Sequence, residues 1–528
     1  MNKHVKIAIP LLVGIIIWLI PVPSGLTPNA WYYFAIFVAG ILALMFEVLP
    51  GAVCGLIVVG LAATLSLVPP SPPPAPAPSP AAKVVSSADA PKADMKAAKP
   101  ENSPSTQANP NVTPKPQTAA PATKKPSPTD EIKWALSGFS NLNVWLIFAA
   151  FTFAAGYEKT GLGRRIALLM VKMLGRSTLG LGYAVTCADL ALAPFLPSQT
   201  ARSGGTIFPI VSNIPLLYGS TPENDPRKIG SYLMWINVVA GTITSVAFLT
   251  ASAPNLLAVT MAEKITGFSI GWTDWFIYML PVSVVLLLTI PYLVYLIYPP
   301  ELKSSPEAPA WAAEQLKELG PMRAKEITMA LLALVALLMW IFGGKYMNPT
   351  LVALVLISVM VPTKVVSWDD ILGNKAAWNI LLWYGTLLSI AEGLERVGFL
   401  HWFCQNLAAS ISGYDVTIVI ILMIASFWYA SYFFASISGM TTALLPPYLM
   451  AALLVPGLPL KAFTMIACGS LMLRGALAPY CLPSGIIVFG TGYIKSTTFW
   501  RLGFIFSTIC LIALLGLEIP YLYMLLGK

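Results

Sequence analysis

Two short segments, residues 197–205 and 436–442, place helix-breaking residues beside hydroxyl side chains within otherwise apolar stretches. The first reads PSQTARSGG and the second reads SISGMTT. Proline or glycine beside serine and threonine interrupts a helix and starts a new one, whose free N–H groups carry about half a positive charge. Such an end can receive a carboxylate. Two ends that face one cavity would therefore bind a small dianion, one carboxylate each.

Two further apolar stretches break in a similar way, at residues 250–255 (TASAPN) and 478–485 (APYCLPSG). Unwound backbone at membrane depth persists only where protein or water satisfies its polar groups, so we expect both breaks to line the same cavity. A simple kink is the alternative for each break taken alone. The candidate substrate-binding residues are Ser198, Gln199, Thr200, Arg202, Ser436, Ile437, Ser438, Thr250, Pro254, Asn255, Pro483 and Ser484.

Three ionisable residues, Asp189, Arg202 and Arg474, lie within apolar stretches, where a charge is costly and normally faces a partner or a cavity. We expect Arg202 to contact the substrate. Arg474 either contacts the substrate as well or pairs with Asp189 in a structural role.

A charge balance links these residues to a mechanism. Two helix ends supply about one positive charge, so a bound dianion leaves about one negative charge to be neutralised by a cation or an arginine. If Arg202 does this, the empty site keeps a cation that resists crossing the bilayer core. This predicts obligatory exchange, with sodium-coupled symport as the alternative.

The elements that position these residues are apolar helices. The chain is 57% hydrophobic and 10% charged, with a mean hydropathy of +0.74, whereas soluble domains are about a quarter charged. We predict an all-α membrane protein with about 11 transmembrane helices. The expected spans are residues 5–21, 31–47, 51–68, 140–158, 229–262, 275–298, 325–343, 350–363, 376–395, 461–493 and 500–526. Residues 178–217 and 415–456 are too interrupted for straight helices, and we predict that each forms a re-entrant hairpin.

Residues 69–133 are rich in Pro, Ala, Ser, Thr and Lys and lack the apolar content that would offset their ordering entropy. They predict a disordered loop, either a spacer without a partner or a segment that touches anionic surfaces. Basic residues gather on one side of the alternating spans, which predicts a bacterial inner-membrane protein with a cytoplasmic N-terminus and a periplasmic loop and C-terminus. The predicted units are N-terminal helices (1–68), the loop (69–133), a first repeat (134–300), a cytoplasmic linker (301–324) and a second repeat (325–528).

The division into repeats follows from a duplicated motif. Residues 158–162 (EKTGL) end the fourth span, and residues 395–399 (ERVGF) end the ninth. Each motif precedes an amphipathic stretch and a hairpin, with 37 positions from Gly161 to Ser198 and 38 from Gly398 to Ser436. One unit ends its span inside and the other outside, which predicts an inverted repeat with the substrate between the two hairpins. Chance similarity of apolar segments is the alternative.

Enzymatic chemistry lacks its usual residues. The chain has two histidines, and its six cysteines stand singly, so neither zinc catalysis nor a serine–histidine pair is indicated. We predict a carrier, not an enzyme, without a metal or other cofactor and without a nucleic-acid partner, although sodium remains open. An anion channel is the alternative of another class, and it is disfavoured because hairpins that meet at the midplane bind a substrate.

Four segments resemble a known family: residues 197–205 (PSQTARSGG), 250–258 (TASAPNLLA), 145–148 (WLIF) and 489–494 (FGTGYI). They are similar to the divalent anion/sodium symporter family, most of all to its branch of 2-oxoglutarate/malate translocators and citrate/succinate or tartrate/succinate antiporters. The resemblance covers nearly the whole chain except the loop. It implies a homodimer with scaffold and elevator-type transport domains that moves malate, 2-oxoglutarate, succinate, tartrate or citrate.

The family pattern also implies a Ser-Asn-Thr-type motif at each hairpin tip. Ser198 and Thr200 match the first motif, and Ser436 matches the start of the second. The departures are Gln199 in place of asparagine, Ser438 in place of threonine, Met440 in place of histidine, and Leu482-Pro483-Ser484 in place of a threonine-containing loop. They leave the identity of the carboxylate and any sodium site open.

Overall fold

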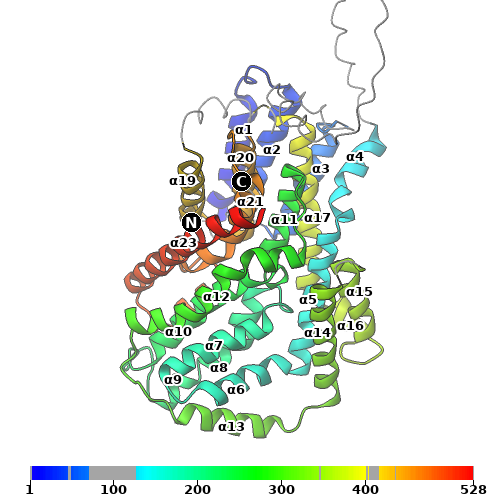
Figure 1. The fold of residues 1–528 in the computed structure, drawn as a ribbon. Helices are drawn as coiled ribbons and strands as arrows, with labels where there is room; N and C mark the ends of the chain where they lie inside the picture. The colour runs from blue at the N-terminus through cyan, green and yellow to red at the C-terminus, as the bar shows by residue number, and fades with distance from the viewer. Residues whose placement is uncertain are drawn as a thin grey trace, which may run out of the picture.

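The computed structural model describes residues 3–45, 49–69, 127–343, 346–399, 402, 415–434 and 436–526. Within these residues the regular structure is helical, and the only β-type pairing is one isolated antiparallel bridge between Ser177 and Ser304. Figure 1 shows the helices packed into one elongated body. The prediction of an all-helical protein is confirmed.

The expected spans coincide with helices of the structure. The unbroken ones are α1 (Lys3–Leu19), α2 (Pro28–Met45), α3 (Gly51–Thr64), α5 (Leu142–Thr160), α12 (Trp272–Ile297), α14 (Ala324–Phe342), α15 (Pro349–Met360), α17 (Lys375–Arg396) and α23 (Ser496–Leu526). Among the described residues, four helical stretches are long and apolar enough to cross a membrane, and further apolar helices are shorter. The four are Trp272–Ile297, Ala324–Phe342, Val416–Phe433 and Ser496–Leu526.

The predicted disordered loop was too long at its C-terminal end. Residues 70–126 lie outside the described residues, but α4 (Pro128–Ala135) occupies the rest. Ser127 and Asp130 form a reciprocal capping box at the start of α4, and Pro128 stands in its first turn. These local signals start a helix although the composition of the whole segment is polar.

The predicted hairpins and breaks appear in two units of the same order. The first unit contains α5, α6 (Leu162–Leu174), α7 (Thr178–Leu192), the π-helical turn η3 (Thr200–Ile207), α8 (Phe208–Val211), α9 (Ile214–Leu217), α10 (Gly230–Ala247), η4 (Leu249–Ala251), α11 (Ala253–Thr266) and α12. The second contains α17, α19 (Val416–Tyr429), η5 (Ala430–Phe433), α20 (Ile437–Leu453), α21 (Leu460–Leu473), η6 (Arg474–Ala476), α22 (Pro483–Gly490) and α23. Most of the second amphipathic stretch lies outside the described residues. The short helices α13 (Glu307–Leu319) and α16 (Trp368–Leu372) belong to neither unit, and α13 packs along α6.

The duplicated motif has one backbone conformation in both units. Gly161 follows α5 with φ of +78°, and Gly398 follows α17 with φ of +79°. A residue without Cβ adopts this left-handed conformation without strain, which is why glycine commonly follows a helix end. The motif therefore ends both helices by the same physical means.

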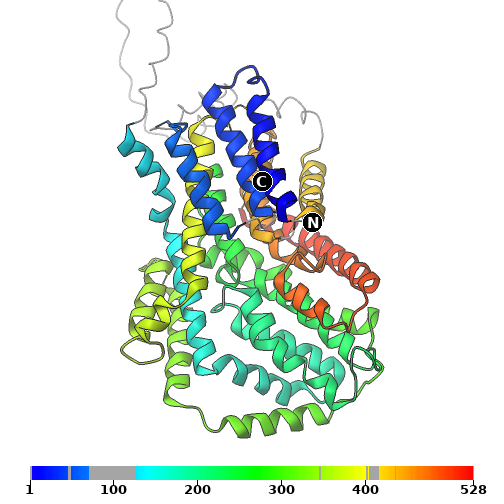
Figure 2. The same ribbon diagram turned by 180° about the vertical axis from the view of Figure 1, so that it is seen from behind.

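The two units run in opposite directions. The start of α17 lies beside the middle of α5, where Asn374 Nδ2 donates to the carbonyl of Phe151 at 3.2 Å. The C-terminal half of α17 lies beside the segment that precedes α5 in the chain. There the N–H of Gly138 donates to Ser389 Oγ at 3.0 Å. Both views show α5 and α17 side by side (Figures 1 and 2). The two helices that end in the duplicated motif are thus antiparallel in the structure, as an inverted repeat requires.

The broken helices meet at their breaks. Ser252 Oγ, between η4 and α11, contacts Met472 Sδ at 3.1 Å near the end of α21. A Cβ on Gly475 would lie 3.1 Å from Thr242 Cγ2 on α10. The second half of each broken helix packs on the hairpin of the opposite repeat. Helix α11 packs along α20 of the second hairpin, and α22 packs on η3 of the first. Each hairpin is therefore held by the half-helix of the opposite repeat.

Candidate functional site

The tip of the first hairpin is the loop that leads into η3. Ser198 and Thr200 are half-buried there, and Ser198 Oγ accepts from the backbone N–H of Ala201 at 3.2 Å. Gln199 is buried, and its Oε1 accepts from Ser484 Oγ at the start of α22 at 2.6 Å. Gln199 Nε2 has no hydrogen-bond partner among the described residues. The structure thus brings three of the predicted site residues, Gln199, Thr200 and Ser484, into one neighbourhood.

Arg202 has a structural role in place of the substrate contact that we expected. Its side chain is fully buried, and its Nε donates to Asp189 Oδ1 at 2.5 Å. Its Nη1 donates to the carbonyls of Leu196 and Ala251, and its Nη2 donates to Thr244 Oγ1 and Ser245 Oγ. These contacts engage the five N–H groups that a guanidinium has. The alternative prediction, an ion pair between Asp189 and Arg474, is also wrong, because Asp189 forms its ion pair with Arg202.

This ion pair changes the charge balance of the site. Asp189 cancels the charge of Arg202, so Arg202 is not the fixed cation that neutralises a substrate. The carboxylate also accepts from the hydroxyls of Ser203 and Thr244. The cluster joins α7, η3, α10 and η4 into one unit beneath the tip.

The tip of the second hairpin is the start of α20. Ser436 caps this helix, because its Oγ accepts from the backbone N–H of Gly439 at 3.3 Å. Ile437 is buried, whereas Ser438 is half-buried and its Oγ lies 3.2 Å from Tyr384 Oη of α17. The second tip therefore faces a helix that lies outside its own hairpin.

The residues of the first break anchor the first hairpin. Thr250 Oγ1 donates to the carbonyl of Pro194 at 2.7 Å, and the N–H of Ala253 donates to the carbonyl of Pro197 at 2.9 Å. Asn255 Nδ2 donates to the carbonyl of Ser245 at 2.7 Å and satisfies a carbonyl that the break leaves free. Asn255 Oδ1 is buried and has no hydrogen-bond partner among the described residues.

Two prolines mark the starts of the second half-helices. Pro254 opens α11 and is half-buried, and Pro483 opens α22 and is exposed. Proline suits the first turn of a helix because the N–H that it lacks would have no partner within the helix there. The hairpin tips are connected through α11, which bonds to the first tip at Ala253 and packs along α20.

A cavity of about 410 Å³ lies beside the first hairpin. It is bounded by the end of α5, the start of α6, the second arm of the hairpin and α13, with Glu158, Arg164, Thr206 and Asn213 among its polar lining residues. Tyr157, which also lines it, stacks on Phe195 with ring centroids 5.7 Å apart. Because Phe195 comes directly before the first tip, the inner wall of this cavity adjoins the tip.

A second cavity occupies the repeat-related place, but it holds only about 20 Å³. Glu395 lines it together with Lys264, Thr442 and Pro446, the last two on α20. Glu158 and Glu395 are the first residues of the duplicated motif, so each unit places one carboxylate at the cavity beside its hairpin. The two cavities differ in size, and apart from the two hairpins and the two glutamates they are lined by different elements: α13 at the first, and α2 and α11 at the second.

Sequence reasoning missed these two glutamates as cavity-lining residues. Their signal was present, since EKTGL and ERVGF were recognised as a duplication, but the motif was used only to define the repeat. It also missed Ser245 and Thr244, because one hydroxyl on an apolar helix has no distinctive pattern.

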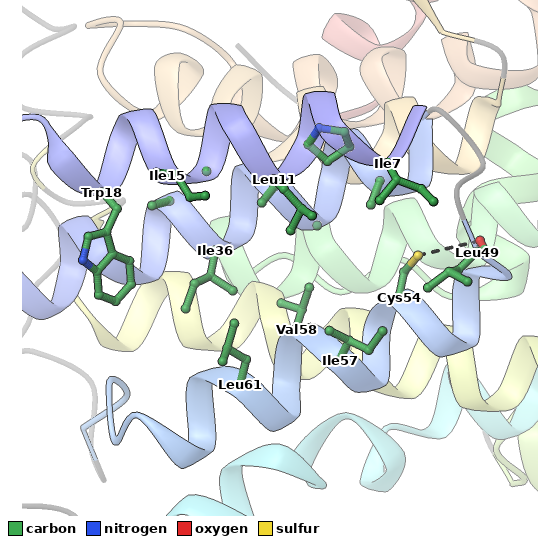
Figure 3. Close-up of a pocket in the computed structure, with 16 residues that line it drawn as sticks. Ile7, Leu11, Ile15, Trp18, Ile36, Leu49, Cys54, Ile57, Val58 and Leu61 are labelled. Atoms are coloured by element: carbon green, nitrogen blue, oxygen red, sulfur yellow. Dashed lines mark hydrogen bonds between the residues drawn. The ribbon is translucent and has the colours of Figure 1, made fainter. Parts of the chain in front are cut away.

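A third cavity, of about 400 Å³, lies among α1, α2 and α3 (Figure 3). Its lining is apolar, with Leu11, Ile36 and Val58 among the side chains that point into it. Cys54 Sγ on its wall contacts the carbonyl of Leu49 at 3.7 Å. An apolar cavity offers no donors to an anion, so it does not belong to the candidate site.

Comparisons with known proteins agree with the geometry. The chain matches the family model described as "Sodium:sulfate symporter transmembrane region" over residues 1–527. It is 42% identical over 506 residues to the L-tartrate/succinate antiporters of Escherichia coli O6:K15:H31 (strain 536 / UPEC) and Shigella sonnei (strain Ss046), covering 96% of this chain and 95% of each relative.

A solved structure shares the fold. The Alcanivorax borkumensis YdaH transporter aligns with a TM-score of 0.52 over 75% of this chain and 88% of that chain, at 13% identity. The matches confirm the resemblance stated above and the prediction of a transporter instead of an enzyme. Because the family model spans almost every residue and the relatives align over nearly their whole length, this chain belongs to the sodium:sulfate symporter family of membrane transporters.

Proposed function

We propose that this protein is a secondary transporter that exchanges small dicarboxylates of the tartrate and succinate class across a bacterial inner membrane. The observation that carries the proposal is the 42% identity, over 96% of the chain, to relatives named L-tartrate/succinate antiporters. The geometry supports it, because two hydroxyl-rich hairpin tips and two half-helix starts lie in an antiparallel repeat. This arrangement suits a small anion held between discontinuous helices.

In this proposal the substrate lies between the two tips. Ser198, Thr200, Ser436 and Ser438 are half-buried and carry the hydroxyls that face it. The starts of α11 and α22, marked by Pro254 and Pro483, place the positive ends of two helices at the site. Gln199 and Asn255 each keep one buried amide atom that has no partner among the residues described, which leaves these atoms available to the substrate or its water.

The proposed motion is of the elevator type. The hairpins and broken helices pack mainly on one another, as do α3, α5 and α17, so the two groups suit a transport domain and a scaffold. The cavity at Glu158 is open and its repeat counterpart at Glu395 is nearly closed. With the N-terminus in the cytoplasm, this conformation faces inward, and the outward-facing one reverses the two cavities. We further propose a homodimer, a periplasmic C-terminus and no resident cofactor.

Counterflow in proteoliposomes tests the proposed exchange. Vesicles loaded with unlabelled succinate should take up labelled tartrate or succinate, whereas vesicles without an internal dicarboxylate should not. Sodium-coupled symport is the second candidate, which the description of the matching family model favours. Accumulation into empty vesicles that requires a sodium gradient would decide for symport, and currents far faster than exchange would indicate a channel.

The hydroxyl of Thr200 is expected to contribute to substrate affinity. Thr200→Ala removes one half-buried hydroxyl at the first tip. The apparent KM for the dicarboxylate should therefore rise by about fivefold to tenfold, which is the effect expected from the loss of one hydrogen bond to the substrate. Initial exchange rates over a range of external succinate measure this. Thr289→Ala is the matched control, because Thr289 is exposed on α12 and its hydroxyl bonds within its own helix. An unchanged KM in the folded Thr200→Ala variant would remove this residue from the site.

An ion pair joins the two helix groups on the closed side. Lys264 Nζ of α11 lies 3.1 Å from Glu392 Oε2 of α17, and the same carboxylate oxygen accepts from Ser137 Oγ at 3.0 Å. If α11 moves relative to α17 during transport, this pair must separate. Lys264→Met should therefore favour the outward-facing conformation by about twofold to fivefold, the range for a partly exposed pair.

The measurement is labelling of a cysteine placed at Thr442 by an impermeant maleimide added from the side of the closed cavity. The rate should increase when Lys264→Met is added. Lys461→Met is the control, because that lysine is exposed and lies over the ring of Phe268. Equal labelling rates with and without Lys264→Met would contradict the proposal that the ion pair between Lys264 and Glu392 separates during transport.

A further inference from the structure

Arg474 is a fully buried cation without a carboxylate partner. It begins η6, at the break of the second repeat, and none of the ion pairs among the described residues includes it. Its guanidinium lies 4.2 Å from the ring centroid of Phe427. The other arginine that is buried at a hairpin or helix break, Arg202, has Asp189 as its counter-ion. The buried arginine is therefore paired with a carboxylate in the first repeat but not in the second.

The free donors of Arg474 lie on one edge of the guanidinium. Nη1 donates to the carbonyl of Phe427 at 2.9 Å, whereas Nε and Nη2 are buried and have no hydrogen-bond partner in the part of the chain that the structure describes. Nε–H and one N–H of Nη2 point the same way and form the fork that binds a carboxylate with two parallel hydrogen bonds. In Arg202 the same two nitrogens are engaged, by Asp189 Oδ1 and Ser245 Oγ.

The C-terminal end of α21 stabilises Arg474 only in part. A helix C-terminus carries about half a negative charge, which favours an arginine there and is the simplest structural role for it. It does not satisfy the two free donors, and leaving buried donors of a charged group without partners is costly. A ligand that brings both an anionic charge and two acceptor oxygens would remove this cost.

The position of Arg474 is also that of the proposed site. Met472, two positions before it, contacts Ser252 of the first repeat, and a Cβ added at Gly475, directly after it, would lie 3.1 Å from Thr242 Cγ2. Arg474 therefore stands where the two breaks meet. Phe427, whose carbonyl accepts from Arg474 Nη1, is on the first arm of the second hairpin.

We propose that Arg474 binds one carboxylate of the transported dianion through Nε and Nη2, and that its charge makes exchange obligatory. This inference rests on the proposed dicarboxylate exchange. The empty transporter holds an uncompensated buried cation, which resists movement through the bilayer core. A bound dicarboxylate neutralises it, so the transporter reorients only when loaded. Arg474 thus has the role that the sequence pattern suggested for Arg202.

Arg474→Gln tests both parts of this proposal. We expect the apparent KM for succinate to rise by about tenfold or more, since a charge-assisted bidentate contact is lost. We also expect labelled succinate to leave loaded proteoliposomes into substrate-free medium, because the empty variant is neutral and can return. The wild type should retain its label until external dicarboxylate is added. Succinamate, with one carboxylate replaced by an amide, should compete poorly in the wild type and nearly as well as succinate in the variant.

Two further variants make the result specific. Arg474→Lys keeps the charge and loses the fork, so we expect a raised KM with exchange still obligatory. Arg501→Gln is the control, because it removes one exposed arginine of α23 and should change neither property. If Arg474→Gln fails to fold, as judged by size-exclusion chromatography, Arg474→Lys decides the contact, and Arg474→Met, which also removes the charge, decides the coupling.

Three outcomes are distinguishable. An unchanged KM in folded Arg474→Gln or Arg474→Lys would overturn the contact. A raised KM with efflux still dependent on external dicarboxylate in Arg474→Gln would overturn the coupling role. If the wild type exchanges no dicarboxylate at all, the proposed function fails before Arg474 is tested.

Discussion

Asp189→Asn is expected to lower the free energy of unfolding by about 3–5 kcal/mol, the usual effect of removing one partner of a buried ion pair. The substitution leaves the guanidinium of Arg202 without a counter-ion in a place with no exposed surface. It also weakens the acceptor of the Ser203 and Thr244 hydroxyls. Since the same cluster holds the first hairpin against α10 and η4, a lower exchange rate should accompany the loss of stability.

Thermal unfolding of the purified protein in detergent measures this effect. Lys159→Met is the matched control, because it breaks an ion pair with Asp370 whose side chains are 45% and 33% exposed. Exposed pairs contribute about 0–1 kcal/mol, so the control should shift the transition far less. A double variant, Asp189→Leu with Arg202→Met, should recover much of the stability, because apolar replacement of both partners is often neutral. Equal shifts for Asp189→Asn and Lys159→Met would show that the buried pair is not a major contributor.

Gly241→Ala is expected to reduce the exchange rate by about tenfold or more, because one inserted methyl group in a packed site costs about 1–3 kcal/mol. Gly241 lies on α10, directly beneath the first hairpin tip. A Cβ there would overlap Gln199 Nε2 and Ser203 Oγ and would lie 3.1 Å from Ser203 Cβ. The tip must move to accept it, which disturbs the contact between Gln199 and Ser484 that joins the two repeats.

The same substitution at another helical glycine separates this clash from helix propensity. Gly516 lies within α23, and a Cβ added there meets no atom within 4 Å. Alanine is favoured over glycine in a helix by about 1 kcal/mol, so Gly516→Ala should be as stable as the wild type or more so and fully active. Counterflow rates for the two variants, normalised to protein inserted, make the comparison. Similar activity in both would mean that the first tip tolerates displacement and lies outside the rate-determining geometry.

The helices and the repeat could be predicted because they depend on local patterns. Apolar stretches of membrane-spanning length defined the spans, and Pro and Gly within the stretches at 178–217 and 415–456 separated hairpins from straight helices. The motifs ending at Gly161 and Gly398 predicted the same helix end twice, and both have the same positive φ. The error at Pro128 arose because composition was averaged over a long segment, whereas a capping box acts over four residues.

The role of each candidate residue could not be predicted in the same way. Asp189 and Arg202 are 13 positions apart, but a break lies between them, so no helical periodicity states whether their side chains meet. Gln199 and Ser484 are 285 positions apart and meet because each repeat packs its half-helix on the other's hairpin. Lys264 and Glu392 likewise come from different repeats.

The sequence by itself determined that this is an all-helical membrane transporter, where its chain breaks, and that its two halves are related. Those properties follow from hydropathy, helix-breaking residues and a repeated motif, each of which acts within one helix or its end. Only the tertiary structure decided that Asp189 neutralises Arg202 and that two buried nitrogens of Arg474 have no partner among the described residues. Which buried charge finds a counter-ion depends on the distance and direction between side chains on different helices, and packing sets these after the helices have formed.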